Sequence, residues 1–247
     1  MIITYENIKI DLNKGIDISL TLKNGEENPR AWYVDPPKFI PVRTADWTGV
    51  VKEGGAVNFR DIFFNPHGHG THTECLGHIT PEVYSVNALL KKYFFEAELI
   101  SIKPEEITQS GQIDRVITAK QLIEKLKGKT TEALIIRTLP NSNDKKSKNY
   151  STTNPPYMEA DGVEVLNKAG VKHLLVDLPS VDKELDGGVL AFHHAFWGVP
   201  KNLQLDKTIT EFIYVEDAVS DGKYLLNLQV APFENDAAPS RPVIFPL

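Results

Sequence analysis

Strand-like and helix-like patterns alternate between residues 95 and 178. Three apolar runs have the length and composition of buried strands: Phe95–Ile102, Leu134–Ile136 and Val171–Leu178. A capping box formed by Thr118 and Gln121 opens a predicted helix that Gly128 ends. Met158–Ala169 is a second predicted helix, ended by Gly170. Because helices with short links separate the strands, the sequence predicts an α/β fold with parallel strand pairing.

Four further strands are predicted outside this region: Ile16–Leu20, Asn58–Phe64, Ile209–Val215 and Tyr224–Ala231. Residues 28–41 are rich in proline and aromatic side chains and predict a loop. Trp32, Tyr33 and Phe39 in this loop either line a substrate pocket or cap the core. No repeat, low-complexity tract or linker interrupts the chain, so residues 1–247 are expected to form a single domain with a mixed β-sheet.

The composition excludes several classes of protein. The net charge is −6, whereas a nucleic-acid binder normally presents a basic face. The one dense basic run, Lys145, Lys146 and Lys148, predicts a solvated loop. The chain lacks the roughly 18–20 consecutive apolar residues of a membrane span and has no signal-peptide pattern, so a cytoplasmic protein is expected. A single cysteine, Cys75, cannot form an intramolecular disulfide.

Four of the seven histidines lie within one segment of twelve residues, together with a glutamate. Imidazole and carboxylate ligands suit zinc, manganese or iron(II), and a histidine is also an effective general base near neutral pH. In an extended chain His72, Glu74 and His78 share one face. Leu76 is expected on that face and Cys75 on the opposite one, as a packed core residue. The signatures HExxH and GxSxG and a glycine-rich phosphate loop are absent.

Five blocks carry a resemblance to a known family: Gly70–His78 (pattern HxGTHxDxPxH), Leu134–Thr138 (a strand ending in Arg-Thr), Asp177–Asp182 (Asp-x-Pro-Ser-Val-Asp), His193–Trp197 (His-Arg-x-Leu-Leu) and Glu211–Ile213 (Glu-x-Leu). These patterns resemble those of the cyclase family, which includes bacterial kynurenine formamidases. The blocks follow the order of the family and extend over most of the chain. The resemblance implies the family's swivelling β/β/α fold and a homodimer or homotetramer.

The resemblance also implies a metal site for one or two divalent ions, zinc or manganese. His72 and Glu74 would bind the first ion together with the leading histidine of the motif. Glu74, His193 and Glu211 would bind the second ion, and His78 would serve as the general acid/base. A carboxylate that bridges two ions beside an activated water suits amide or ester hydrolysis.

Three positions depart from the family pattern. Gly68 occupies the position of the leading histidine, between His67 and His69. The bridging aspartate is Glu74 and the proline is Leu76. His67 is the preferred replacement, because a glycine-containing bulge accommodates one extra residue, and His69 is the alternative. The longer carboxylate also changes the separation of two ions, so a single ion remains an alternative to two.

Other residues have a structural interpretation. Asp177 and Asp182 flank a Pro-Ser turn, and turn formation explains them. His173 is interpreted as a strand residue without a role. Burial of Glu211 would indicate a metal, because a buried carboxylate without a partner is costly.

The sequence therefore predicts a metal-dependent hydrolase that acts on a small-molecule amide, formamide or cyclic amide or ester. This activity is arylformamidase-like, on carbon–nitrogen bonds other than peptide bonds. Two alternatives are a metal-dependent cyclase or lyase and a non-catalytic binding protein on the same fold.

Overall fold

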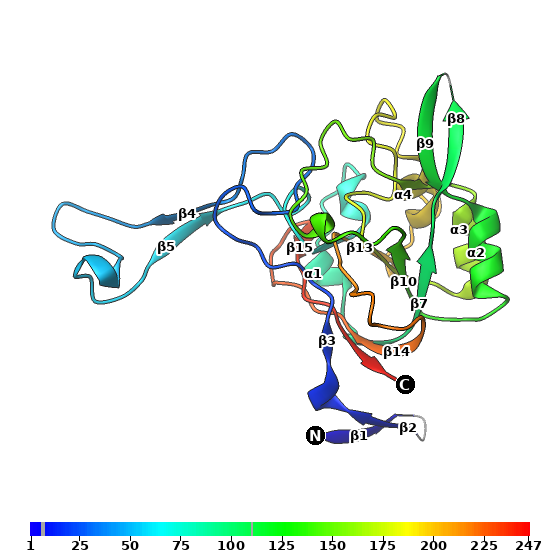
Figure 1. Ribbon diagram of the computed structural model, residues 1–247, viewed down its shortest axis with the longest axis horizontal. Helices are drawn as coiled ribbons and strands as arrows, with labels where there is room; N and C mark the ends of the chain where they lie inside the picture. The colour runs from blue at the N-terminus through cyan, green and yellow to red at the C-terminus, as the bar shows by residue number, and fades with distance from the viewer. Residues whose placement is uncertain (6–7, 110) are drawn as a thin grey trace.

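A mixed nine-stranded sheet organises the protein (Figure 1). The computed structural model describes residues 1–5, 8–109 and 111–247. The strand order is β15 (Ala237–Pro239), β6 (His72–Glu74), β13 (Thr208–Glu211), β12 (His173–Val176), β10 (Ala133–Thr138), β7 (Phe94–Ile102), β14 (Gly222–Asn227), β16 (Val243–Pro246) and β3 (Ile16–Asp17). The four strands β13, β12, β10 and β7 are parallel, and every other pairing in this sheet is antiparallel. The predicted α/β class with a mixed sheet is confirmed.

Three helices cover one face of the sheet: α2 (Ala119–Leu126), α3 (Gly162–Ala169) and α4 (Ala191–Trp197). The predicted capping box is present, since the Thr118 hydroxyl accepts from the Gln121 amide and the Gln121 side chain accepts from the Thr118 amide. The second helix is shorter than predicted. Residues 157–158 form strand β11 (Tyr157–Met158), which pairs with β9 (Gln112–Ile117).

Alternation along the central strands produces two apolar layers. In β10, Leu134 and Ile136 pack towards the helices, whereas Ala133 and Ile135 pack on the opposite face. The helix-facing layer includes Leu122, Leu166, Phe192, Phe196 and Ile209. The central strands are therefore buried on both sides.

Several predicted strands end earlier than expected. Strand β3 covers only Ile16–Asp17, and beyond it the Ser19 amide donates to the Asp17 side chain and the Leu20 amide to the Thr71 hydroxyl instead of a neighbouring strand. Strand β13 ends at Glu211, because Phe212 adopts a left-handed conformation with φ of 54°. Strand β14 ends at Asn227, and Val230 forms only an isolated bridge with Ser240.

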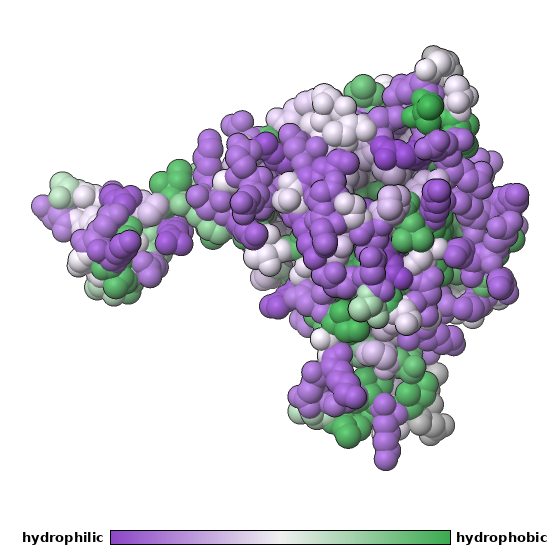
Figure 2. Space-filling model, viewed as in Figure 1, coloured by the Kyte–Doolittle hydropathy of each residue, from purple (hydrophilic) through white to green (hydrophobic). Residues whose placement is uncertain are grey.

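Strands β4 (Lys38–Pro41) and β5 (Arg60–Phe63) form a long arm that extends away from the sheet (Figure 1). The strand predicted at Asn58–Phe64 is therefore present but lies outside the core. Figure 2 shows apolar side chains at the surface of this arm. The exposed apolar residues of the arm are Ile40, Trp47, Val51, Val57, Phe59, Ile62 and Phe63.

Two smaller hairpins project from the body: β1 (Ile2–Tyr5) with β2 (Ile8–Asp11), and β8 (Glu105–Gln109) with β9. The remaining elements of the described residues are α1 (Val86–Leu89) and four 3₁₀ turns: η1 (Leu12–Lys14), η2 (Val51–Glu53), η3 (Leu76–His78) and η4 (Asn143–Lys146). The basic run in and after η4 was predicted to be a solvated loop, but two of its lysines are paired. Lys145 bonds to the buried Asp177 at 2.8 Å, and Lys146 pairs with Glu216 at 2.6 Å.

Candidate metal centre

The antiparallel pairing of β6 with β13 places three buried side chains on one face of the sheet. His72 lies directly opposite Glu211, and Glu74 lies two residues further along β6. His72 Nε2 is 3.4 Å from a Glu211 carboxylate oxygen. Glu211 is 3 % exposed, which is the burial that the sequence analysis linked to a metal.

His78 reaches the same group by a different route from the one predicted. The chain leaves the extended conformation after Cys75 and forms the 3₁₀ turn η3. This turn sends Leu76 into the core, so the predicted common face for Leu76 and Glu74 is wrong. The turn also folds His78 back, and its Nε2 lies 4.0 Å from a Glu74 oxygen.

Cys75 is fully buried in the core, which confirms its predicted packing. Its thiol donates to the Tyr84 carbonyl oxygen at 3.5 Å. Burial raises the pKa of the Cys75 thiol to about 11. A neutral, buried thiol is a poor nucleophile, so the geometry disfavours a role for Cys75 in catalysis.

The structure places His67, and not His69, at the cluster. His67 Nδ1 is 3.0 Å from Glu74. Both ring nitrogens of His69 are occupied elsewhere, because Nδ1 accepts from the Asn65 amide and Nε2 donates to a backbone carbonyl, each at 2.8 Å. A side chain at Gly68 itself would begin 2.8 Å from a methyl group of Val34. A histidine at the expected position of the motif would therefore require Val34 to move.

His193 enters from helix α4. Its Nε2 lies 3.0 Å from Glu74, and its Nδ1 lies 2.6 Å from Asp182. The Asp182 carboxylate also accepts from the amides of Phe192 and His193 at the start of the helix. Turn formation is therefore an incomplete account of Asp182, whose side chain orients His193.

Asp177 also does more than form a turn. It accepts from the Thr138 amide and hydroxyl, each at 2.9 Å, and pairs with Lys145. These bonds tie the carboxyl ends of β10 and β12 together.

Asp236 is a residue of the cluster that the sequence analysis missed. One of its oxygens lies 2.7 Å from His67 Nε2 and 3.5 Å from His78 Nδ1. It is separated from His67 by 169 positions and belongs to a polar segment before β15. No local pattern distinguishes it from the carboxylates of an ordinary loop.

The charges within the cluster are strongly interdependent. Burial raises the pKa of Glu74, but His78, His193 and His67 outweigh it and hold that pKa well below its usual range. Burial and the Glu74 charge raise the pKa of Glu211. Burial lowers the pKa of His193, but its bonds to carboxylates outweigh it and raise that pKa to about 10. Burial also lowers the pKa of His67, but its bonds to Asp236 and Glu74 outweigh this effect and raise that pKa to about 10.

Two sets of donor atoms fit a divalent cation: His67, Glu74 and His78, and His72, Glu74 and Glu211. Within each set the donor atoms lie within 4.8 Å of one another, and Glu74 is common to both. His72 Nε2 is buried and has no hydrogen-bond partner. A buried ring nitrogen left unpaired beside two carboxylates is suited to a metal bond. The residues present therefore fit a cation. The ligand sets differ from the one that the family resemblance implied, in which His193 and Glu211 bind the same ion.

A cavity of about 350 Å³ opens onto this cluster. Trp32, Val34 and Leu190 provide apolar surface, and Lys183 and Glu184 lie among its polar residues. Trp32 thus lines the cavity, whereas Tyr33 is exposed and Phe39 belongs to the arm. An apolar wall opposite convergent polar groups is the usual form of a small-molecule site.

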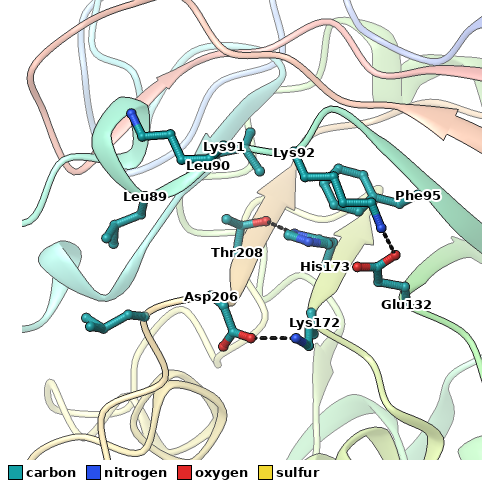
Figure 3. A pocket seen from close by; sticks show the side chains of 11 residues that line it. Leu89, Leu90, Lys91, Lys92, Phe95, Glu132, Lys172, His173, Asp206 and Thr208 are labelled. Carbon is teal, nitrogen blue, oxygen red and sulfur yellow. Dashed lines mark hydrogen bonds and ion pairs between the residues drawn. The ribbon is translucent and has the colours of Figure 1, made fainter.

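His173 lies in a separate cavity of about 230 Å³, near the start of β12 (Figure 3). Its Nδ1 is 2.9 Å from the Thr208 hydroxyl, and burial lowers its pKa to about 4. The ion pairs Lys172–Asp206 and Lys92–Glu132 lie at the same cavity. His173 is absent from both donor sets found among the described residues.

Comparisons with known proteins extend over most of the chain. The family described as "Putative cyclase" matches residues 16–183. The kynurenine formamidase of Bacillus thuringiensis (strain Al Hakam) is 28% identical over 233 residues, which cover 94% of this chain and 97% of the relative. The kynurenine formamidase of Bacillus cytotoxicus is 29% identical over 234 residues, with the same coverage.

Solved structures share the fold at low sequence identity. An isatin hydrolase bound to the product analogue thioisatinate superposes with a TM-score of 0.68 at 14% identity, covering 94% of this chain and 92% of that one. A potential metal-dependent hydrolase with cyclase activity gives a TM-score of 0.66 at 15% identity, covering 94% and 97%. Within the described part of the chain, every helix is too short or too polar to cross a membrane.

Proposed function

Because the chain belongs to the putative cyclase family, we propose that it is a metal-dependent hydrolase of small amides, with arylformamidase-like activity. The observation that carries this proposal is the buried Glu74 carboxylate, which contacts His67 and His193 at 3.0 Å and faces the unpaired Nε2 of His72 across the same site. Formamidase relatives and an isatin hydrolase fold neighbour support carbon–nitrogen bond hydrolysis.

The proposed metal ligands are His67, His72, Glu74, His193 and Glu211. Imidazole and carboxylate donors suit zinc or manganese, as one or two ions. A bound divalent ion supplies a Lewis acid for the carbonyl and lowers the pKa of water.

The protein's own groups supply the rest of the chemistry. His78 is the proposed proton carrier, because its side chain is 31 % exposed and Nε2 faces the Glu74 side of the cavity. A ring nitrogen in this position can take a proton from the attacking water and deliver it to the leaving nitrogen. The apolar wall of the cavity, including Trp32, supports an aromatic substrate.

Hydrolysis of N-formyl aromatic amines and lactams tests this function. Zinc- or manganese-loaded protein is expected to cleave at least one such amide, to lose activity with a chelator and to regain it when the metal returns. In heavy-oxygen water the carboxylate product should carry the label, because the attacking oxygen comes from solvent. Turnover that persists in chelator would contradict any metal-dependent activity. An unlabelled product would contradict hydrolysis and favour the metal-dependent cyclase or lyase alternative.

We further propose a single domain over residues 1–247 that forms a homodimer through the arm of β4 and β5. One sheet takes strands from residue 16 to residue 246, which supports one domain. A two-stranded hairpin is only marginally stable in water on its own, and this one exposes large apolar side chains. We therefore propose that the arm of a second copy of the chain covers these side chains.

Light scattering is expected to give a particle of twice the chain's 27.6 kDa. The double variant Ile62→Asp/Phe63→Asp should be monomeric, because it places charges on both faces of β5. Val83→Asp is the matched control, since Val83 is, like Ile62 and Phe63, an exposed apolar residue, but it lies outside the arm. A wild-type monomer at micromolar concentration, or a dimeric arm variant, would refute the arm as the interface.

A further inference from the structure

Asp236 is held beside the cluster by its backbone. Its carbonyl oxygen accepts from the Cys75 amide at 3.0 Å, just before strand β15 begins. Gly77 permits the close approach, because a Cβ there would lie 3.1 Å from the Asp236 Cβ and 2.3 Å from the Tyr84 carbonyl oxygen. The position of residue 236 against turn η3 is therefore fixed independently of its side chain.

The Asp236 carboxylate spans two imidazoles. Its Oδ2 is 2.7 Å from His67 Nε2 and 3.5 Å from His78 Nδ1. The opposite nitrogens of both rings face one Glu74 oxygen, at 3.0 Å for His67 and 4.0 Å for His78. The two rings are stacked, with centroids 4.2 Å apart. Two imidazoles thus lie side by side between an inner and an outer carboxylate.

Every imidazole of the cluster has this arrangement, in which one ring nitrogen faces the buried carboxylates and the other meets an oxygen atom. His72 Nδ1 lies 3.1 Å from the Gly70 carbonyl oxygen, and His193 Nδ1 lies 2.6 Å from Asp182. For the remaining two imidazoles that oxygen belongs to Asp236. A histidine that binds a metal usually donates its far N–H to such an oxygen, which fixes the tautomer and the direction of the ring.

We propose that Asp236 is a positioning residue of the metal site, whose carboxylate holds His67 and His78 with their opposite ring nitrogens facing Glu74. The inference rests on the proposed metal-dependent function and adds a residue outside the motif. A positioning role for Asp236 also explains how His67 can replace the displaced histidine of the motif. His67 stands one position before the expected place, and the bond to Asp236 holds its ring on Glu74.

Two substitutions separate positioning from general stabilisation. Asp236→Ala removes the oxygen that both rings contact, so the affinity for Zn²⁺ is expected to fall by about 10- to 100-fold, measured by competition with a chromophoric chelator. Asp236→Asn keeps an acceptor oxygen and should lose less affinity than Asp236→Ala. The visible absorption spectrum of the Co²⁺-loaded protein should shift in the alanine variant, because a reoriented ring changes the ligand geometry.

Glu234→Gln is the matched control, because Glu234 is an exposed carboxylate two positions away, and it should keep wild-type affinity. Wild-type affinity and an unchanged Co²⁺ spectrum in Asp236→Ala would overturn the inference while leaving the proposed function intact. Equal losses in the asparagine and alanine variants would also overturn it, because the hydrogen bond would then not be the cause. A wild-type protein that binds neither Zn²⁺ nor Co²⁺ would refute the proposed function itself.

Discussion

Glu211→Gln is expected to lower metal-dependent hydrolysis by roughly 100-fold or more, because Glu211 is a proposed metal ligand. Substituting a residue that only hydrogen-bonds to a ligand typically costs about 10- to 100-fold. The same variant should leave the metal-free protein at least as stable as wild type. Burial and the nearby Glu74 charge raise the pKa of Glu211, so its ionised form is disfavoured in the metal-free fold. Glutamine removes that charge and keeps an acceptor oxygen for the Val181 amide, which lies 3.2 Å away.

The stability of the metal-free protein should depend on pH in a definite direction because of Glu211. A carboxyl group with a raised pKa contributes stability below its ordinary pKa of 4.5 and loses it as the pH rises through the higher folded value. Glu211→Gln should therefore flatten the decline in metal-free stability over that range. Thermal unfolding of chelator-treated protein at several pH values measures this effect.

Glu98→Gln is the matched control for Glu211. Glu98 is also a buried glutamate on a strand, but it pairs with Lys129, away from the cluster. This variant should lower the melting temperature, because it breaks an ion pair, and should leave metal binding unchanged. A Glu211→Gln protein that melts lower than wild type without metal, yet still binds metal and hydrolyses substrate, would show that Glu211 has a structural role.

The substitutions His67→Ala and His69→Ala should have opposite consequences for hydrolysis. His67→Ala removes a contact to Glu74 and should reduce hydrolysis by roughly 100-fold or more. His69→Ala should preserve hydrolysis. It removes two hydrogen bonds from a buried ring and leaves the Asn65 amide without its partner, so unfolding should become easier by about 1–3 kcal/mol.

Steady-state kinetics and chemical denaturation of the two purified variants check this pair. The two histidines are two positions apart in one loop, so each variant serves as the control for the other. If His69→Ala were the inactive protein and His67→Ala the active one, the placement of the displaced motif histidine would be reversed.

Local periodicity predicted the parts of the site that lie on regular strands. His72 and Glu74 share a face because β6 is extended through both, and the capping box predicted the start of α2. The same rule failed two residues later, because η3 ends the alternation and buries Leu76. An apolar run predicts a strand whether it faces a core or solvent, so the position of β5 on an exposed arm could not be inferred.

The long-range parts of the site had no local signal. His193 and Glu211 were predicted only through the family resemblance, since each is an unremarkable residue in its own helix or strand. Asp182 and Asp236 support imidazoles from a turn and a loop, where aspartate is common for reasons of backbone geometry alone. Their partners lie 11 and 169 positions away, so the folded chain was needed to pair them.

Anomalous diffraction from crystals of the zinc- or manganese-loaded protein is the most direct test of the metal centre. An anomalous peak is expected at about 2.0–2.2 Å from both a Glu74 carboxylate oxygen and His72 Nε2. Loaded crystals in which no anomalous peak lies within bonding distance of Glu74 would contradict the proposed metal centre.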